Sequence, residues 1–136
     1  MSEEITLGNS LPEIRNVMQR LEELAEKWHL DNRILFDISL SLDELLTNII
    51  SYGYQDDTAH QIRIGIELKA DQIIIVLQDD GREFNPLSAK SPDFRTGLNE
   101  KPIGGLGIHL VRKMMDGVDY RREAGLNILT LTKNLD

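Results

Sequence analysis

Apolar residues follow helical spacing in three segments of the chain. Across residues 11–28 they recur every three or four positions, which predicts an amphipathic helix with Trp28 in the core. The same spacing across residues 32–54 predicts a second helix. A shorter helix is expected from the glycine cluster at 104–107 to about Gly117.

Polar residues before the first two helices provide start signals. Ser10 and Glu13 have the spacing of a capping box, in which each side chain satisfies a free backbone N–H of the first turn. Asp31 or Asn32 is of the type that caps a helix N-terminus. Two consecutive helices are therefore expected, separated by a short turn.

The remaining apolar runs have the pattern of strands. Strands are expected at about 3–7, 62–69, 73–77, 118–122 and 126–133. The run at 73–77 is apolar throughout, which is typical of a central strand. Strand hairpins mixed with helices predict an α+β two-layer sandwich.

Length and composition narrow the class of protein. A chain of 136 residues fits one domain, 1–136. It has no cysteine, no apolar run near the about 20 residues that span a bilayer, and no signal-peptide pattern, so we expect a cytoplasmic protein. The net charge of −8 disfavours direct binding to nucleic acid or to an anionic membrane.

Two polar residues interrupt the apolar second helix. Glu44 and Asn48 are four positions apart and so lie one turn apart on the same side. An asparagine oxygen can bind Mg²⁺, and a glutamate beside it could orient a hydroxyl for phosphoryl transfer. Taken alone, the pair is better explained as the solvated face of an amphipathic helix.

Two further motifs follow the predicted central strand. Asp79, with Gly81 two positions later, could accept a hydrogen bond from an exocyclic amine while the glycine lets a flat ring approach, although Asp-Gly is also common turn chemistry. Glycines 104, 105 and 107 precede a helix, where backbone N–H groups can bind phosphate; a short glycine cluster is a weak signal by itself. Residues 82–103, between these motifs, show no periodicity and form a long loop, which is usually functional.

The three motifs together, in this order, resemble the GHKL (Bergerat-fold) ATPases. Glu44-Leu-Leu-Thr-Asn48 is similar to their N box, Asp79-Asp-Gly-Arg-Glu-Phe-Asn-Pro86 to their G1 box, and Gly104-Gly-Leu-Gly107 with the following residues to Asp116 to their G2 box. Within that superfamily the chain most resembles bacterial anti-sigma factor serine/threonine kinases. The similarity covers nearly the whole chain and implies a mixed sheet with about three helices on one face.

The resemblance also implies a role for each motif residue. Glu44 would be the general base and Asn48 would bind Mg²⁺. Asp79 would hold the adenine amine, and Gly81 would lie beside the ring. The other residues that the resemblance places at the nucleotide are Phe84 of the G1 box, Gly104, Gly105, Leu106 and Gly107 at the phosphates, and Thr130 near adenine. Residues 87–103 would be the ATP lid.

The activity implied is that of an ATP- and Mg²⁺-dependent serine/threonine kinase. Such a kinase sequesters a sigma factor and phosphorylates a small antagonist protein of the STAS type, and its relatives act as homodimers. Glu83 stands where the wider superfamily often has a second glycine, so a non-catalytic nucleotide-binding module stays open as an alternative. A histidine kinase ATPase domain is a further alternative, disfavoured because we expect no helical, histidine-bearing dimerisation segment before the ATP-binding domain.

Overall fold

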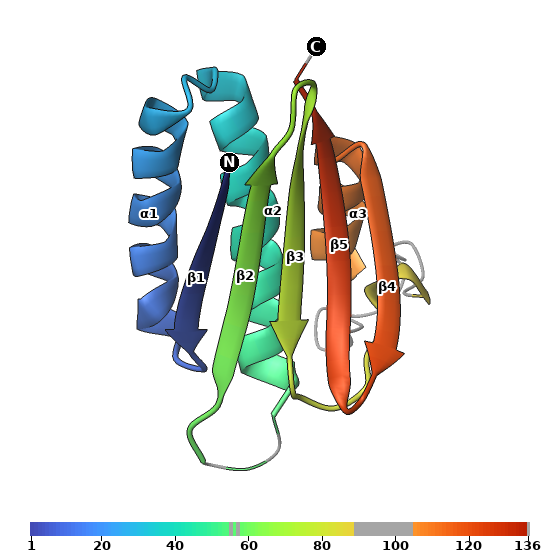
Figure 1. The fold of residues 1–136 in the computed structure, drawn as a ribbon. Coiled ribbons are helices and arrows are strands. Elements are labelled where there is room, and N and C mark those ends of the chain that lie inside the picture. Colours follow the sequence, from blue (N-terminus) through green and yellow to red (C-terminus); the bar gives the residue numbers. More distant parts are fainter. Residues whose placement is uncertain (55, 57, 89–104, 136) are drawn as a thin grey trace.

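A computed structural model of the chain describes residues 1–54, 56, 58–88 and 105–135. Figure 1 shows one sheet with helices packed behind it. The elements, in chain order, are β1 (Ser2–Gly8), the 3₁₀ turn η1 (Leu11–Glu13), α1 (Ile14–Lys27), α2 (Asn32–Tyr52), β2 (Gln61–Leu68), β3 (Gln72–Asp79), the 3₁₀ turn η2 (Pro86–Ser88), α3 (Gly105–Met114), β4 (Gly117–Glu123) and β5 (Leu126–Asn134). The predicted helices and strands are thereby confirmed.

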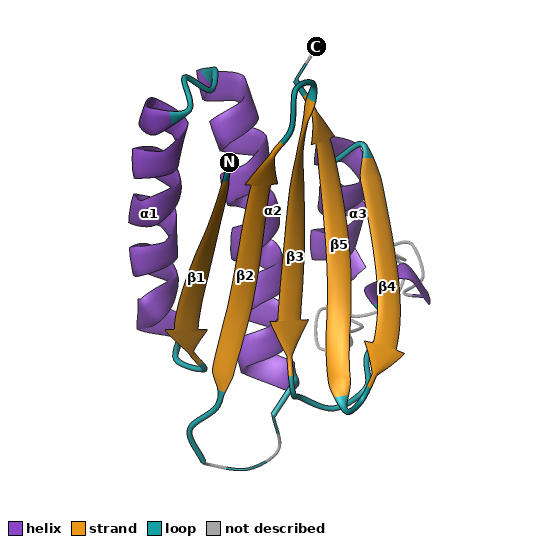
Figure 2. Cartoon of the chain, in the orientation of Figure 1, coloured by secondary structure: helices purple, strands orange, loops and turns teal. Residues whose placement is uncertain are grey.

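The sheet is antiparallel, not mixed as the family resemblance suggested. Its strand order is β1-β2-β3-β5-β4, and each pair of neighbours runs antiparallel. The crossover through α3 returns the chain in the direction of β3, so β4 runs parallel to β3. The two do not pair because β5 inserts between them and is antiparallel to both. Figure 2 shows this alternation of arrows across the sheet.

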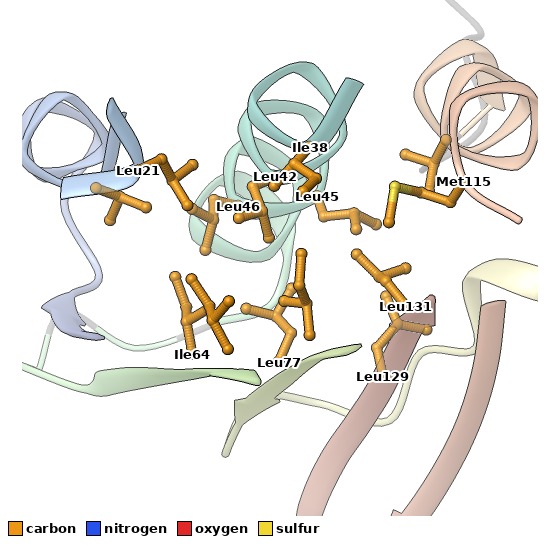
Figure 3. Packing of buried hydrophobic residues seen from close by; sticks show 14 of the residues in the cluster. Leu21, Ile38, Leu42, Leu45, Leu46, Ile64, Leu77, Met115, Leu129 and Leu131 are labelled. Carbon is orange, nitrogen blue, oxygen red and sulfur yellow. The ribbon is translucent and has the colours of Figure 1, made fainter. Parts of the chain in front are cut away.

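The helices cover one face of the sheet and enclose the core there (Figures 1 and 2). Figure 3 shows leucines of α2 pointing down onto Leu77, Leu129 and Leu131 of the central strands. The central strand was correctly predicted: Ile73, Ile75 and Leu77 are buried toward the helices, and the residues between them are half-buried on the opposite face. This explains why β3 is apolar without alternation. None of the helices in the described part of the chain has both the length and the apolar character needed to cross a bilayer.

The helix starts differ in how well the sequence predicted them. Asp31 caps α2 as expected, because its Oδ1 accepts a hydrogen bond from the Arg33 N–H at 2.7 Å. The capping box at Ser10 is not formed, since the Ser10 side chain makes no capping bond. Glu13 instead reaches back beyond the turn, and its Oε1 accepts from the Gly8 N–H at 3.0 Å. The glutamate therefore fixes the end of β1 rather than the helix N-terminus.

A buried ion pair joins three elements behind the sheet. Lys133 of β5 lies 2.8 Å from the Asp37 carboxylate of α2, and the two side chains are only 9% and 11% exposed. The Lys133 Nζ also donates to the Met114 carbonyl at the end of α3, at 2.6 Å. Each charge depends on its partner, because a lone charge at such a position is strongly destabilising. The pair fixes α2 and α3 relative to the same strand.

The Lys133→Met substitution should therefore lower the free energy of unfolding by about 3–5 kcal/mol, because it leaves Asp37 buried without a counter-charge. The double variant Asp37→Leu/Lys133→Met should recover most of that loss. Urea denaturation of the three proteins measures both effects, with Lys113→Met on the exposed side of α3 as the charge-matched control. Equal losses in Lys133→Met and Lys113→Met would contradict the role of the pair.

Candidate functional site

A narrow pocket of about 40 Å³ lies between α2 and the ends of the central strands. Its lining residues are Leu45, Asn48, Ile49, Tyr52, Gly53, Leu77, Asp79, Arg82, Phe84, Pro86, Tyr120, Asn127 and Leu129. Most of this lining is apolar or aromatic, and a few polar side chains converge on it, as is typical of small-molecule sites. The pocket brings together three of the predicted site residues, namely Asn48, Asp79 and Phe84.

Asp79 is a buried carboxylate at the end of β3, with the residue 5% exposed. Its Oδ1 accepts two hydrogen bonds, one from the Gly81 N–H at 2.9 Å and one from the Asn127 Nδ2 at 3.0 Å. Burial raises the pKa of Asp79 because the charged form is poorly solvated, and the two hydrogen bonds oppose that rise. Neither bond uses the second carboxylate oxygen, Oδ2.

Asn127 is the central polar residue of the site, and the sequence analysis missed it. It lies on β5 directly opposite Asp79, and it is 7% exposed. Besides Asp79, its Nδ2 donates to the Arg82 carbonyl at 2.8 Å, and its Oδ1 accepts from the Tyr120 hydroxyl at 2.6 Å. The side chain therefore connects β3, β4, β5 and the segment after β3.

Thr130 does not join this group, contrary to the family-based prediction. It pairs with Val76 in the sheet register, and neighbouring positions on a strand point to opposite faces. Because Leu129 and Leu131 are buried toward the helices, Thr130 faces away from them and from Asp79. A signal was present in the sequence: Asn127 shares the parity of the two leucines, whereas Thr130 has the opposite parity.

Glu44 and Asn48 of α2 lie beside Gly107 in the first turn of α3. A Cβ added at Gly107 would lie 2.8 Å from the Glu44 Oε2 and 3.4 Å from the Asn48 Nδ2. The glycine thus lets the first turn of α3 approach both polar side chains closely. A larger residue would force the glutamate to move.

Gly81 has a packing role that the sequence analysis did not foresee. A Cβ at this position would lie 2.6 Å from the Gly53 carbonyl oxygen and 2.9 Å from the Asp79 Oδ1. The Arg82 N–H donates to the same Gly53 carbonyl at 2.8 Å. The missing side chain therefore allows the turn after β3 to dock on the end of α2, beside the pocket.

Several of the residues predicted to form the nucleotide site lie outside the described part of the chain. Gly104 and the greater part of the expected lid, residues 89–103, lie outside it. Gly105 and Leu106 form the first turn of α3. Arg112 of α3 donates to the Leu87 carbonyl at 2.6 Å and so joins α3 to the described beginning of the loop.

The His60 side chain and its partners form a cluster, here called the His60 cluster, that joins the segment between α2 and β2 to the end of β3. The His60 ring contacts the Asp56 carboxylate at 2.8 Å and the Asp80 carboxylate at 3.2 Å, and it stacks on Tyr54 with ring centroids 4.3 Å apart. Hydrogen bonds to Asp56 and then to Asp80 raise the pKa of His60. The cluster therefore anchors Asp80, the neighbour of Asp79.

Comparisons with known proteins agree with this geometry. The family model described as histidine kinase-like ATPase domain matches residues 9–133. The serine/threonine-protein kinase BtrW of Bordetella bronchiseptica is 30% identical over 114 residues, covering 84% of this chain and 80% of the relative. The serine-protein kinase RsbW of Bacillus mycoides is 29% identical over 97 residues, covering 68% of this chain and 60% of that protein.

A solved structure shows the same fold. The crystal structure of the RsbU and RsbW domains of a Mycobacterium tuberculosis protein matches with a TM-score of 0.72 at 19% sequence identity. The match covers 99% of this chain and 32% of that chain. The sheet-and-helix arrangement described above is therefore one that occurs in an experimentally determined protein.

The His60 cluster predicts a pH-dependent contribution to stability. Because folding raises the pKa of His60, its contribution is present below the unfolded pKa and is lost as pH rises through the folded value. Asp56 has a lowered pKa, mainly through its bond to His60, so its contribution is lost at acidic pH. Urea denaturation should show His60→Gln most destabilised near about pH 5–6, and approaching the wild type above the raised His60 pKa. A deficit that is constant with pH, or one shared by the control His109→Gln, would contradict this account.

Proposed function

The chain belongs to the family of histidine kinase-like ATPase domains, and we propose that it is an ATP-dependent serine/threonine protein kinase. The relatives named serine/threonine-protein kinase BtrW and serine-protein kinase RsbW support that reaction. The observation that carries the proposal is the arrangement of polar residues along α2. The oriented Asp79 carboxylate lies beside one end of the helix, and Glu44, Asn48 and Gly107 meet further along it.

The spacing of these two groups suits a nucleotide. Gly53, which contacts Gly81 beside Asp79, lies nine residues beyond Glu44. At about 1.5 Å per residue this corresponds to about 13 Å along the helix axis, which is comparable to the distance from an adenine base to the end of an extended triphosphate. The base end is enclosed by Leu77, Leu129 and Phe84 of the pocket, and the phosphate end faces the first turn of α3.

Each residue then has a task in binding or transfer. Asp79 accepts a hydrogen bond from the exocyclic amine of adenine through its Oδ2, which neither of its two hydrogen bonds to the described residues Gly81 and Asn127 uses. The Asn48 side chain supplies an oxygen ligand for Mg²⁺, and Glu44 accepts the proton of the attacking hydroxyl. Bound ATP would supply the phosphoryl group and leave as ADP, and Mg²⁺ would neutralise the charge on the phosphates. The close approach that Gly107 permits brings the N-terminus of α3 to the same point.

The protein partners follow from the same family. We propose that the chain acts in the cytoplasm on a small antagonist protein of the STAS type, which it phosphorylates on a serine or threonine. Its second partner is a sigma factor, which it sequesters by direct binding. Both interactions are those of anti-sigma factor kinases, and the net charge of −8 favours protein partners over nucleic acid.

Substitution of Asp79 tests the assignment of the base site. Asp79→Asn keeps the size of the side chain and can still accept from Gly81, but it places an NH₂ group against the amine of the base. Calorimetric titration should show ATP affinity at least tenfold weaker, because two donors then face each other in a buried site. Asp71→Asn, in the exposed turn between β2 and β3, is the control. Unchanged affinity in Asp79→Asn would remove the adenine assignment.

Substitution of Glu44 separates binding from transfer. Glu44→Gln should leave ATP affinity within about threefold of the wild type, while the rate of phosphate transfer from radiolabelled ATP to a STAS-type antagonist of the same organism falls by about 10²–10⁴-fold. Asp43→Asn, the exposed neighbour on α2, should change neither. A wild-type protein that binds ATP without transferring phosphate would instead identify a non-catalytic nucleotide-binding module in a partner switch.

A further inference from the structure

We propose that Asn127 is a positioning residue that fixes the orientation of the Asp79 carboxylate for the base of the nucleotide. This inference rests on the proposed ATP site and adds a residue that none of its motifs contains. Asn127 is buried, lies opposite Asp79 in the sheet and donates to the Asp79 Oδ1 at 3.0 Å. With Oδ1 also bonded to the Gly81 N–H, the carboxylate is held by two donors on one oxygen, and the other oxygen is left for the ligand.

Asn127 has no hydrogen-bonding capacity left for a ligand of its own. An amide side chain offers two donor hydrogens and two acceptor lone pairs. Both donors are used, on the Asp79 Oδ1 and the Arg82 carbonyl. The Oδ1 of Asn127 accepts from three donors, which are the Tyr120 hydroxyl at 2.6 Å, the Arg122 Nη1 at 3.2 Å and the Phe84 N–H at 3.4 Å. Asn127 therefore acts on the base through Asp79 and not by direct contact.

The surroundings require an amide at this position. The Nδ2 end faces two acceptors and the Oδ1 end faces three donors, so the partner types fix the orientation of the amide. A carboxylate at position 127 could still accept hydrogen bonds from the three donors. Its second oxygen, however, would place an acceptor against the Asp79 carboxylate and the Arg82 carbonyl. An apolar side chain of similar size would leave the acceptors and donors around both ends of the amide without a hydrogen-bond partner in a buried position.

The aspartate variant gives a test that depends on protonation. In Asn127→Asp two carboxylates face each other at the distance of one hydrogen bond, and such a pair tends to share a proton. When residue 127 holds that proton, its O–H can donate to Asp79 as the amide does in the wild type. When both groups are ionised they repel each other, and Asp79 loses its position.

The other charged or titratable groups around the pair are the same in wild type and variant. They are Tyr120 and Arg122 on β4, Asp80 and Glu83 after β3, and Tyr54 after α2. The quantity to compare is therefore the ratio of the ATP dissociation constants of variant and wild type at each pH. That ratio cancels the contributions that wild type and variant have in common, including the protonation of ATP.

The experiment is calorimetric titration with ATP between about pH 6 and 8.5. The Asn127→Asp ratio should be about tenfold or more at pH 8.5 and should fall toward one as pH decreases, because protonation restores the missing donor. Asn16→Asp, which adds the same charge on the exposed face of α1, should give a ratio near one throughout.

A second variant covers the case in which Asn127→Asp does not fold. Asn127→Leu should also bind ATP about tenfold or more weakly, but with a ratio that does not change with pH. A wild type that binds ATP, combined with a pH-independent ratio for Asn127→Asp or wild-type affinity for Asn127→Leu, would overturn the positioning role alone. A wild type that fails to bind ATP at any pH would overturn the proposed function and this inference with it.

Discussion

The hydrogen bond between Asn127 and Asp79 is the interaction on which the site depends. It joins the ends of the two central strands, β3 and β5, at the point where the sheet meets the pocket. A carboxylate in this position is poorly solvated, and it stays useful as an acceptor only if other groups hold it. The protein provides those groups from the sheet and from the turn at Gly81, so the base site is built into the fold before any ligand arrives.

The second helix connects that site to the core. One side of α2 carries the leucines that pack on the sheet in Figure 3, and an adjacent side carries Glu44 and Asn48. The buried pair of Asp37 and Lys133 sets the position of the helix relative to β5 and to the end of α3. The Gly53–Gly81 contact sets its other end. Core packing and site geometry are therefore fixed by the same element, and a shift of α2 would disturb both.

The sequence predicted those features that depend on local spacing. The spacing of apolar residues predicted the helices and strands, including the central strand. The motifs predicted Glu44, Asn48 and Asp79, and the last two of these line the pocket. It failed where the answer depends on pairing between distant strands. Thr130 was assigned to the site and Asn127 was missed because the register between β3 and β5 decides which residue faces Asp79. The capping box failed for a similar reason, since the Glu13 carboxylate that was expected at the helix N-terminus instead accepts from the Gly8 N–H at the end of β1.

The most direct test of the account is a calorimetric titration of the wild-type protein with ATP, with and without Mg²⁺. The account predicts saturable binding of one nucleotide per chain that becomes stronger when Mg²⁺ is added, because Asp79 holds the base and Asn48 contributes to the metal site. No binding at millimolar ATP would contradict it. The pocket beside α2 would then be a feature of the fold without a nucleotide, and the protein would act on its partners by binding alone.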